Sequence, residues 1–264
     1  MAAPILMYHS VAHEPPGAAR ALSVSPPMFA AQLERLCELG FTAVTFSQMV
    51  AGLRGCRTLP GRAIALTFDD GYADFHTEAL PVLNRLGIPA TLFVTTGWLR
   101  DAGPHAAGHP LGEMLAWTQV IEAAACGVEI GAHGHSHAQL DQLPAAGLRR
   151  EVTTCRALLE DRLGRAITTF ACPYGYSNAK VRRELWAAGY TAACVVGNRM
   201  ADPSEGPDVV PRLTIRRSTS LKRFERIISG QWLALTFLGD RTLTKSWALV
   251  RRSRFTVNGV LGRV

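Results

Sequence analysis

The sequence predicts an α/β fold, a (β/α) barrel of the TIM type with seven or eight parallel strands in a single domain. Short apolar runs recur along the first 215 residues, and segments with helical spacing separate them. The runs are nearly continuous, as expected for parallel strands that are covered on both faces. The number of repeats favours a barrel. An open doubly wound sheet is the alternative, because periodicity does not report closure.

Eight runs are candidate strands, the last of them the weakest: 4–8, 41–46, 63–68, 88–95, 128–132, 167–171, 190–196 and 209–215. Four helices are predicted between them, each ending at a glycine, namely Gly40, Gly87, Gly164 or Gly189. Glycine after the last apolar residue is typical of a left-handed helix cap. In a fold of this kind, polar residues at the C-terminal ends of the strands converge on one site.

Composition excludes several classes of protein. Apolar residues make up 48% and charged residues 19%, which is ordinary for a globular chain and wrong for a disordered one. The N-terminal residues MAAPILMYHSV are interpreted as a strand and not as a signal peptide. No apolar stretch approaches the roughly 18 residues of a spanning helix. We therefore expect a cytoplasmic protein.

The net charge of +7 is unevenly distributed along the chain. From Arg216 onward, eleven Lys or Arg oppose only Glu225 and Asp240, a net charge of +9, so residues 1–215 carry −2. The body is therefore not expected to bind nucleic acid. The sequence divides into a catalytic domain, 1–217, and a basic C-terminal helix and tail, 218–264, of unknown role. This tail is either a solvated face or a weak contact with a membrane surface, a phosphorylated substrate or a partner.

Two adjacent carboxylates, Asp69 and Asp70, follow the apolar run at 63–68 and precede Gly71. At a buried strand end the two side chains would repel each other and lose hydration, so the pair requires a cation or a proton. An exposed Asp-Asp-Gly turn is the alternative interpretation.

Three histidines lie within five residues at the end of the run 128–132. Neutral imidazole is the commonest nitrogen ligand of zinc-like metals. His133 and His137 are four residues apart and would face one point if the turn after the strand is helical, with His135 directed elsewhere. One carboxylate and two histidines leave coordination positions open for water and substrate, as in a catalytic metal site. A surface histidine cluster is the alternative.

A third motif, Pro173-Tyr174-Gly175, follows the run 167–171. Proline and glycine on either side of Tyr174 would constrain the backbone, so that a main-chain N–H could be directed at a developing oxyanion. By itself this tripeptide is a common turn.

With these three motifs the sequence resembles the polysaccharide deacetylases, the NodB-like carbohydrate esterases of family 4, over roughly residues 5–217. The resemblance implies a distorted barrel and a metal-dependent deacetylase that hydrolyses the amide C–N bond of an N-acetylated sugar. Asp69 would be the general base toward the attacking water, and Asp70, His133 and His137 would bind the metal. The main-chain N–H of Tyr174 would assist at the carbonyl oxygen. Zinc suits two nitrogens and one oxygen, with cobalt, nickel and iron open.

The chain departs from the family pattern at three places. Gly134 stands where the family usually has Ser or Thr, and Ala171 stands where it often has the Arg that steadies the base. Arg212 is our candidate to replace that arginine. The usual histidine acid is absent beyond His137, which leaves His9, at the end of the first run, as the candidate general acid.

We expect an enzyme that removes the N-acetyl group from an N-acetylglucosamine-type sugar or glycoside. A hydrolase of another amide or ester with the same metal centre is one alternative. A barrel that binds carbohydrate without hydrolysing it is another, although such a barrel has no need of the Asp69, Asp70, His133 and His137 set. The sequence leaves open which sugar is the substrate, which metal is native and what the oligomeric state is.

Overall fold

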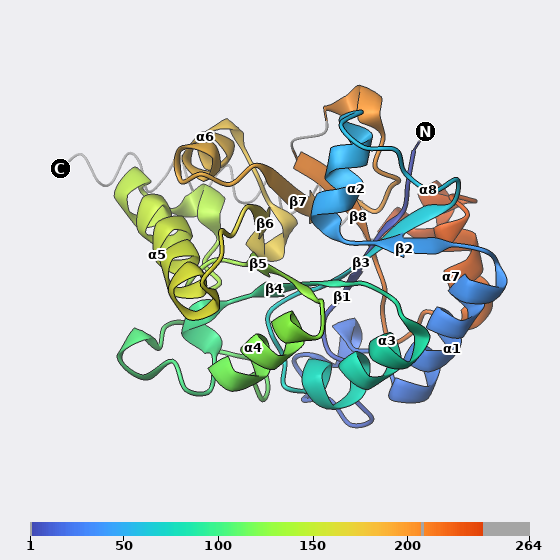
Figure 1. Ribbon diagram of the computed structural model, residues 1–264, viewed down its shortest axis with the longest axis horizontal. Helices are drawn as coiled ribbons and strands as arrows, with labels where there is room; N and C mark the ends of the chain where they lie inside the picture. Colours follow the sequence, from blue (N-terminus) through green and yellow to red (C-terminus); the bar gives the residue numbers. More distant parts are fainter. Residues whose placement is uncertain (1, 207–208, 240–264) are drawn as a thin grey trace.

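The computed structural model describes residues 2–206 and 209–239 of the chain. Within these residues, eight parallel strands follow the order β1-β8-β7-β6-β5-β4-β3-β2, and β1 also pairs with β3. The β1–β3 pairing closes seven strands into a barrel and leaves β2 attached outside β3 (Figure 1). The predicted parallel barrel in one domain is thus confirmed, and the open-sheet alternative is wrong.

Each of the eight predicted runs contains one strand. The strands are β1 Ile5–Tyr8, β2 Thr42–Val44, β3 Ala63–Phe68, β4 Thr91–Val94, β5 Glu129–Ala132, β6 Thr169–Ala171, β7 Ala192–Val196 and β8 Val209–Thr214. Most are shorter than the apolar run that contains them, because apolar residues continue past the last ladder hydrogen bond into the loops.

Helices surround the barrel (Figure 1). They are α1 Pro26–Glu38, α2 Phe46–Leu53, α3 Leu80–Leu86, α4 Trp117–Ala125, α5 Ala145–Leu163, α6 Ala179–Ala187, α7 Leu221–Ile228 and α8 Leu233–Thr236, and a π-helical segment Phe75–Ala79 leads into α3. The predicted strand 41–46 was too long, because Phe46 is the first residue of α2. A reciprocal capping box between Thr45 and Gln48 starts that helix at once. Helices α2 and α4 were not predicted.

The core has two layers, because side chains alternate between the two faces of each strand. Larger residues such as Phe68 and Phe170 pack between the barrel and the helices. Small residues such as Ala65 and Ala171 belong to a separate cluster contributed by the opposite faces of the strands, inside the barrel. This leaves interior space for the fully buried side chain of Arg212.

Part of the predicted C-terminal region packs on the barrel. Phe224, Ile227 and Ile228 of α7 are buried, and α7 lies against α1 (Figure 1). Residues 240–264 of the predicted tail lie outside the described residues. In the part of the chain that the structure describes, no helix is both long and apolar enough to cross a membrane.

Candidate active site

The residues that the motifs single out meet at the C-terminal ends of the barrel strands. His9 follows β1, Asp69 and Asp70 follow β3, His133 and His137 follow β5, and Tyr174 follows β6. They line a cleft of about 320 Å³. Other lining residues are Met7, Ala18, Ala19, Leu22, Tyr72, Leu111, Cys172, Gly175, Val196, Thr214 and Arg216. The cleft is therefore largely apolar, with its ionisable groups gathered around the two aspartates.

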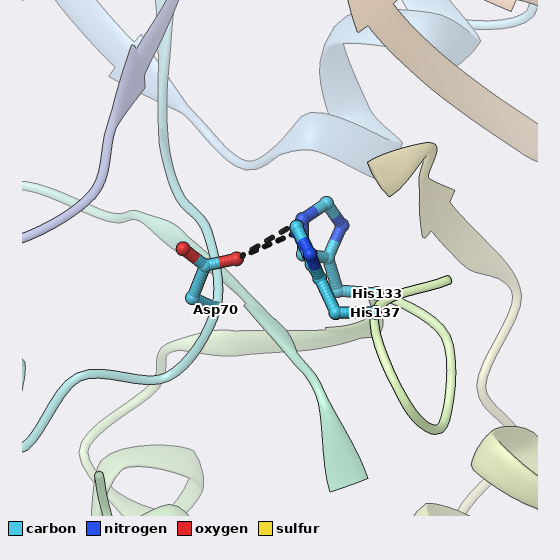
Figure 2. A group of neighbouring side chains, drawn as sticks. All are labelled: Asp70, His133 and His137. Atoms are coloured by element: carbon cyan, nitrogen blue, oxygen red, sulfur yellow. Dashed lines mark ion pairs between the residues drawn. The ribbon is translucent and has the colours of Figure 1, made fainter. Parts of the chain in front are cut away.

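Asp70 and the two histidines form a compact group (Figure 2). Asp70 Oδ1 is 3.3 Å from His133 Nε2 and 3.2 Å from His137 Nε2. Figure 2 shows both imidazoles directed at the carboxylate from the segment after β5. One ligand atom from each residue lies within 4.8 Å of the others, as required for a shared metal ion.

The protonation and burial of the nitrogen and oxygen atoms in this group are suited to binding a cation. His133 Nδ1 lies 2.7 Å from the carbonyl oxygen of Ala171. Because a carbonyl can only accept, this Nδ1 carries a proton, and in the neutral imidazole the lone pair of Nε2 is available to a metal ion beside Asp70. Asp70 Oδ1 is itself buried without a hydrogen-bond donor. Burial raises the pKa of Asp70, but His133 and His137 outweigh it and bring the pKa well below its usual range. These residues could hold a divalent metal.

The loop that carries the histidines is not helical, yet His133 and His137 face one point as expected. Gly134 and His137 have left-handed backbones, with φ of 82° and 59°. Glu151 of α5 holds this shape, because its carboxylate accepts hydrogen bonds of 2.9 Å from the backbone N–H of His135 and of Ser136. Glycine at 134 suits the left-handed conformation, which explains the departure from Ser or Thr.

His135 points away from the two ligand histidines, as the spacing predicted. Its Nδ1 lies 2.9 Å from the hydroxyl of Thr96, on the segment after β4. It therefore packs the loop against its neighbour and takes no part in the Asp70 group.

Asp69 is held by Arg212 of β8. The two terminal nitrogens of the guanidinium each donate a hydrogen bond of 2.6 Å to one carboxylate oxygen of Asp69. Burial raises the pKa of Asp69, but Arg212 and then His133 outweigh it, so the pKa lies below its usual value. Arg212 also donates to the Thr67 hydroxyl at 3.0 Å. Arg212 thus contacts the aspartate that the arginine missing at position 171 would be expected to contact.

His9 lies in the cleft and is partly buried. Its Nδ1 has no hydrogen-bond partner among the described residues. Burial lowers the pKa of His9, and the charges of Asp70 and Asp69 only partly oppose this. The following residues are anchored by Asp74, which accepts from the Ser10 hydroxyl at 2.6 Å and from the Val11 N–H at 2.9 Å. The segment that positions His9 is thereby fixed to the segment after β3.

Tyr174 has the unusual backbone that its neighbours suggested, with a left-handed φ of 59°. Its ring is 51% exposed at the edge of the cleft, with its centroid 4.7 Å from that of His137. Pro173 and Gly175 flank it in one 3₁₀ turn. A left-handed residue other than glycine is costly, and such residues concentrate at functional sites.

Sequence reasoning missed several residues that support the site. Tyr72 is buried and its hydroxyl interacts with Asp70. The indole of Trp98 packs 4.6 Å from the imidazole of His137. Thr214 faces the cleft with a buried hydroxyl that has no partner among the described residues. Only Tyr72 had a local signal, its place directly after Asp69-Asp70-Gly71, since the others reach the site through tertiary folding.

The fold and the site together are those of a (β/α)-barrel protein with a buried Asp–Arg pair beside a carboxylate and two imidazoles that could hold a metal. The chain belongs to the polysaccharide deacetylase family, whose profile matches residues 57–193. The predicted enzyme class, a deacetylase acting on amide C–N bonds, is confirmed by the same comparisons.

Relatives of known name agree with this assignment. The chain is 29% identical over 248 residues to the poly-β-1,6-N-acetyl-D-glucosamine N-deacetylase of Escherichia coli strain K12, with 80% of this chain and 36% of that protein covered. A chitin deacetylase of a Pestalotiopsis species is 34% identical over 134 residues, covering 50% of this chain and 41% of that protein. The chain thus spans well under half the length of these two relatives.

Solved structures show the same fold. IcaB from Ammonifex degensii has a TM-score of 0.72 at 26% identity, covering 84% of this chain and 94% of that one. The Streptococcus pyogenes deacetylase PplD, solved in complex with acetate, has a TM-score of 0.77 at 23% identity, covering 86% and 98%.

Proposed function

We propose that the protein is a metal-dependent hydrolase that removes the acetyl group from an N-acetylglucosamine-type amino sugar or glycoside. One observation carries the proposal. A carboxylate kept ionised by Arg212, Asp69, lies directly beside the group formed by Asp70, His133 and His137. Relatives named for deacetylation of poly-N-acetylglucosamine and of chitin support the choice of substrate class.

Asp70, His133 and His137 would hold the metal, for which we propose zinc, with cobalt, nickel and iron as alternatives. When bound, the ion would act as a Lewis acid toward the substrate carbonyl and the attacking water. The protein's own contribution is to fix the ligand atoms. The hydrogen bond from His133 to Ala171 and the tyrosine beside Asp70 serve that purpose.

The remaining steps fall to residues around the ligands. Asp69 takes a proton from water as the water oxygen bonds to the acetyl carbon. The main-chain N–H of Tyr174 donates to the carbonyl oxygen, and the C–N bond then breaks. His9 protonates the departing nitrogen, which leaves acetate and a free amine. Because burial lowers the pKa of His9, its protonated form is a stronger acid toward that nitrogen.

The test is acetate release from N-acetylglucosamine oligomers, acetate esters and acetylated peptides, with metal content measured for the wild type and Asp69→Ala. We expect release from the amino sugars by the wild type and a loss of about 10²- to 10⁴-fold in the variant, with its metal retained. Faster acetate release from esters or peptides would show that the same metal centre acts on another class of substrate. A fully metallated wild type that binds glycan and releases nothing would overturn the proposal.

A further inference from the structure

Three large apolar side chains stand exposed at the end of the described chain. Trp232 is 68% exposed, Leu235 63% and Leu238 57%, which are the highest values among the large apolar residues that the structure describes. They lie at every third position, with Trp232 before α8, Leu235 in it and Leu238 after it, and the neighbouring Phe237 is buried. Apolar residues exposed singly are ordinary, whereas a contiguous apolar patch indicates an interaction surface. We call these three side chains the α8 patch.

The chain enters the α8 patch from the end of the barrel opposite the catalytic cleft. Ile228 and Ser229, at the end of α7, line a groove of about 470 Å³ together with residues 2–4, which precede β1. The cleft lies at the other end of the same strand, where His9 follows β1. Figure 1 shows α8 on the side of the molecule where the chain begins. A surface that docks through the α8 patch would therefore leave the cleft accessible.

The C-terminal part of the sequence is strongly cationic. Residues 218–264 contain nine Lys or Arg against two acidic residues, a net charge of +7, which equals that of the whole chain. On α7, Lys222 and Arg226 are exposed. One of the two acids, Glu225, is already paired with Arg35 at 2.7 Å. The charge that the structure places next to α8 is therefore positive, since Arg223 of α7 also donates a hydrogen bond of 2.7 Å to the carbonyl oxygen of Thr236 in α8.

Exposed tryptophan and leucine side chains close to cationic residues are suited to bind the surface of an anionic bilayer. Tryptophan prefers the headgroup level of a membrane, and aliphatic side chains insert just below it. Each Lys or Arg near anionic lipid adds attraction without requiring a defined partner geometry. We propose that the α8 patch docks this protein on an anionic lipid surface, with the catalytic cleft facing away from the lipid. The proposal is independent of the substrate.

The test uses the full chain and vesicles of phosphatidylcholine, either pure or mixed with phosphatidylglycerol. We expect the protein to sediment with the mixed vesicles, less with pure phosphatidylcholine, and less again as salt screens the charges. The variant Trp232→Gln/Leu235→Gln/Leu238→Gln should lose at least about tenfold in affinity for the mixed vesicles. Because all three side chains are exposed, circular dichroism and thermal unfolding should match the wild type.

The matched control is Ile121→Gln on α4, which replaces another exposed large apolar residue, 41% exposed, and should leave vesicle binding unchanged. A wild type that stays in the supernatant with mixed vesicles would overturn the proposal. So would a triple variant that binds them as well as the wild type. Concentration-dependent dimerisation of the wild type, lost in the triple variant and without vesicle binding, would instead assign the patch to a second copy of the chain.

Discussion

The guanidinium of Arg212 donates two hydrogen bonds of 2.6 Å to the carboxylate of Asp69, although 143 positions separate the two residues in the chain. Both side chains are buried, at 0% and 3% exposure. Such a bidentate pair orients the carboxylate as well as keeping it ionised. The proposed base is thus positioned from the opposite end of the sequence, through the interior of the barrel.

Removing the arginine should destabilise the protein and shift its pH dependence. Arg212→Met leaves a buried carboxylate uncompensated, so we expect a loss of about 3–5 kcal/mol in the free energy of unfolding. The wild-type pKa of Asp69 is depressed, so its ionised form stabilises the fold above the ordinary carboxyl pKa, and this stability is lost as pH falls through the depressed value. Without Arg212 burial dominates, and the acidic limb of the activity profile should move to higher pH.

Urea unfolding and pH–rate profiles measure these two effects. Arg212→Met/Asp69→Asn should recover part of the lost stability, because no buried charge remains alone. The control is Arg85→Met, which breaks a surface pair with Glu34 in which the two side chains are 56% and 50% exposed. That loss should be below about 1 kcal/mol. Equal losses at Arg85 and Arg212 would contradict the importance assigned to the buried pair.

Metal binding should release a proton from His133 at mildly acidic pH. Burial lowers the pKa of His133, but Asp69 and Asp70 outweigh it, and the pKa lies above its ordinary value in the metal-free protein. Below that pKa the imidazole must lose its proton before it can bind an ion. Zinc titrations by calorimetry, in buffers of different ionisation enthalpy, should show more protons released at about pH 6 than at about pH 8. Proton release that does not change with pH would contradict this assignment.

His9 should contribute to turnover and not to metal affinity. It lies in the cleft but outside the group of three ligand residues. His9→Gln is expected to lower kcat by about 10²- to 10⁴-fold, with zinc content unchanged. His13→Gln alters an exposed histidine of the same loop and should keep wild-type kcat. If His9→Gln retains full turnover, the proton must reach the nitrogen from another group.

Gly134 should be intolerant of a side chain because of its backbone conformation. Its φ is 82°, and an added Cβ would meet Glu151 Oε2 at 3.4 Å. We expect Gly134→Ala to cost about 1–2 kcal/mol of stability. The control is Gly61→Ala, where φ is not in the left-handed region and a Cβ would meet nothing within 4 Å. Thermal unfolding of both variants measures the difference, and equal stabilities would remove the explanation given for glycine at this position.

Some predictions stay predictions. The cytoplasmic location, the domain boundary at residue 217 and the identity of the metal are untested by the fold or the relatives. The packing of α7 against α1 shows only that the first part of the basic region lies on the barrel.

The local pattern of the sequence was enough to predict the eight strands and the motifs that follow three of them. Strand runs are readable because burial on both faces demands continuous apolar residues over a few positions. Helices α2 and α4 escaped prediction, since α2 begins inside an apolar run that a capping box interrupts. The conformation of the loop at 133–137 could not be predicted from its own residues, because Glu151 of α5 holds it by accepting hydrogen bonds from its backbone.

By itself the sequence determined which residue types stand at the strand ends, and hence the chemistry of Asp69, Asp70, His133 and His137. Only the tertiary structure decided that β1 pairs with β3 to close the barrel, and that Arg212 points inward to reach Asp69. The physical reason is the distance along the chain over which each interaction acts. Periodicity and caps act over a few residues, whereas closure and the buried ion pair depend on strand order and on which side chains face the interior.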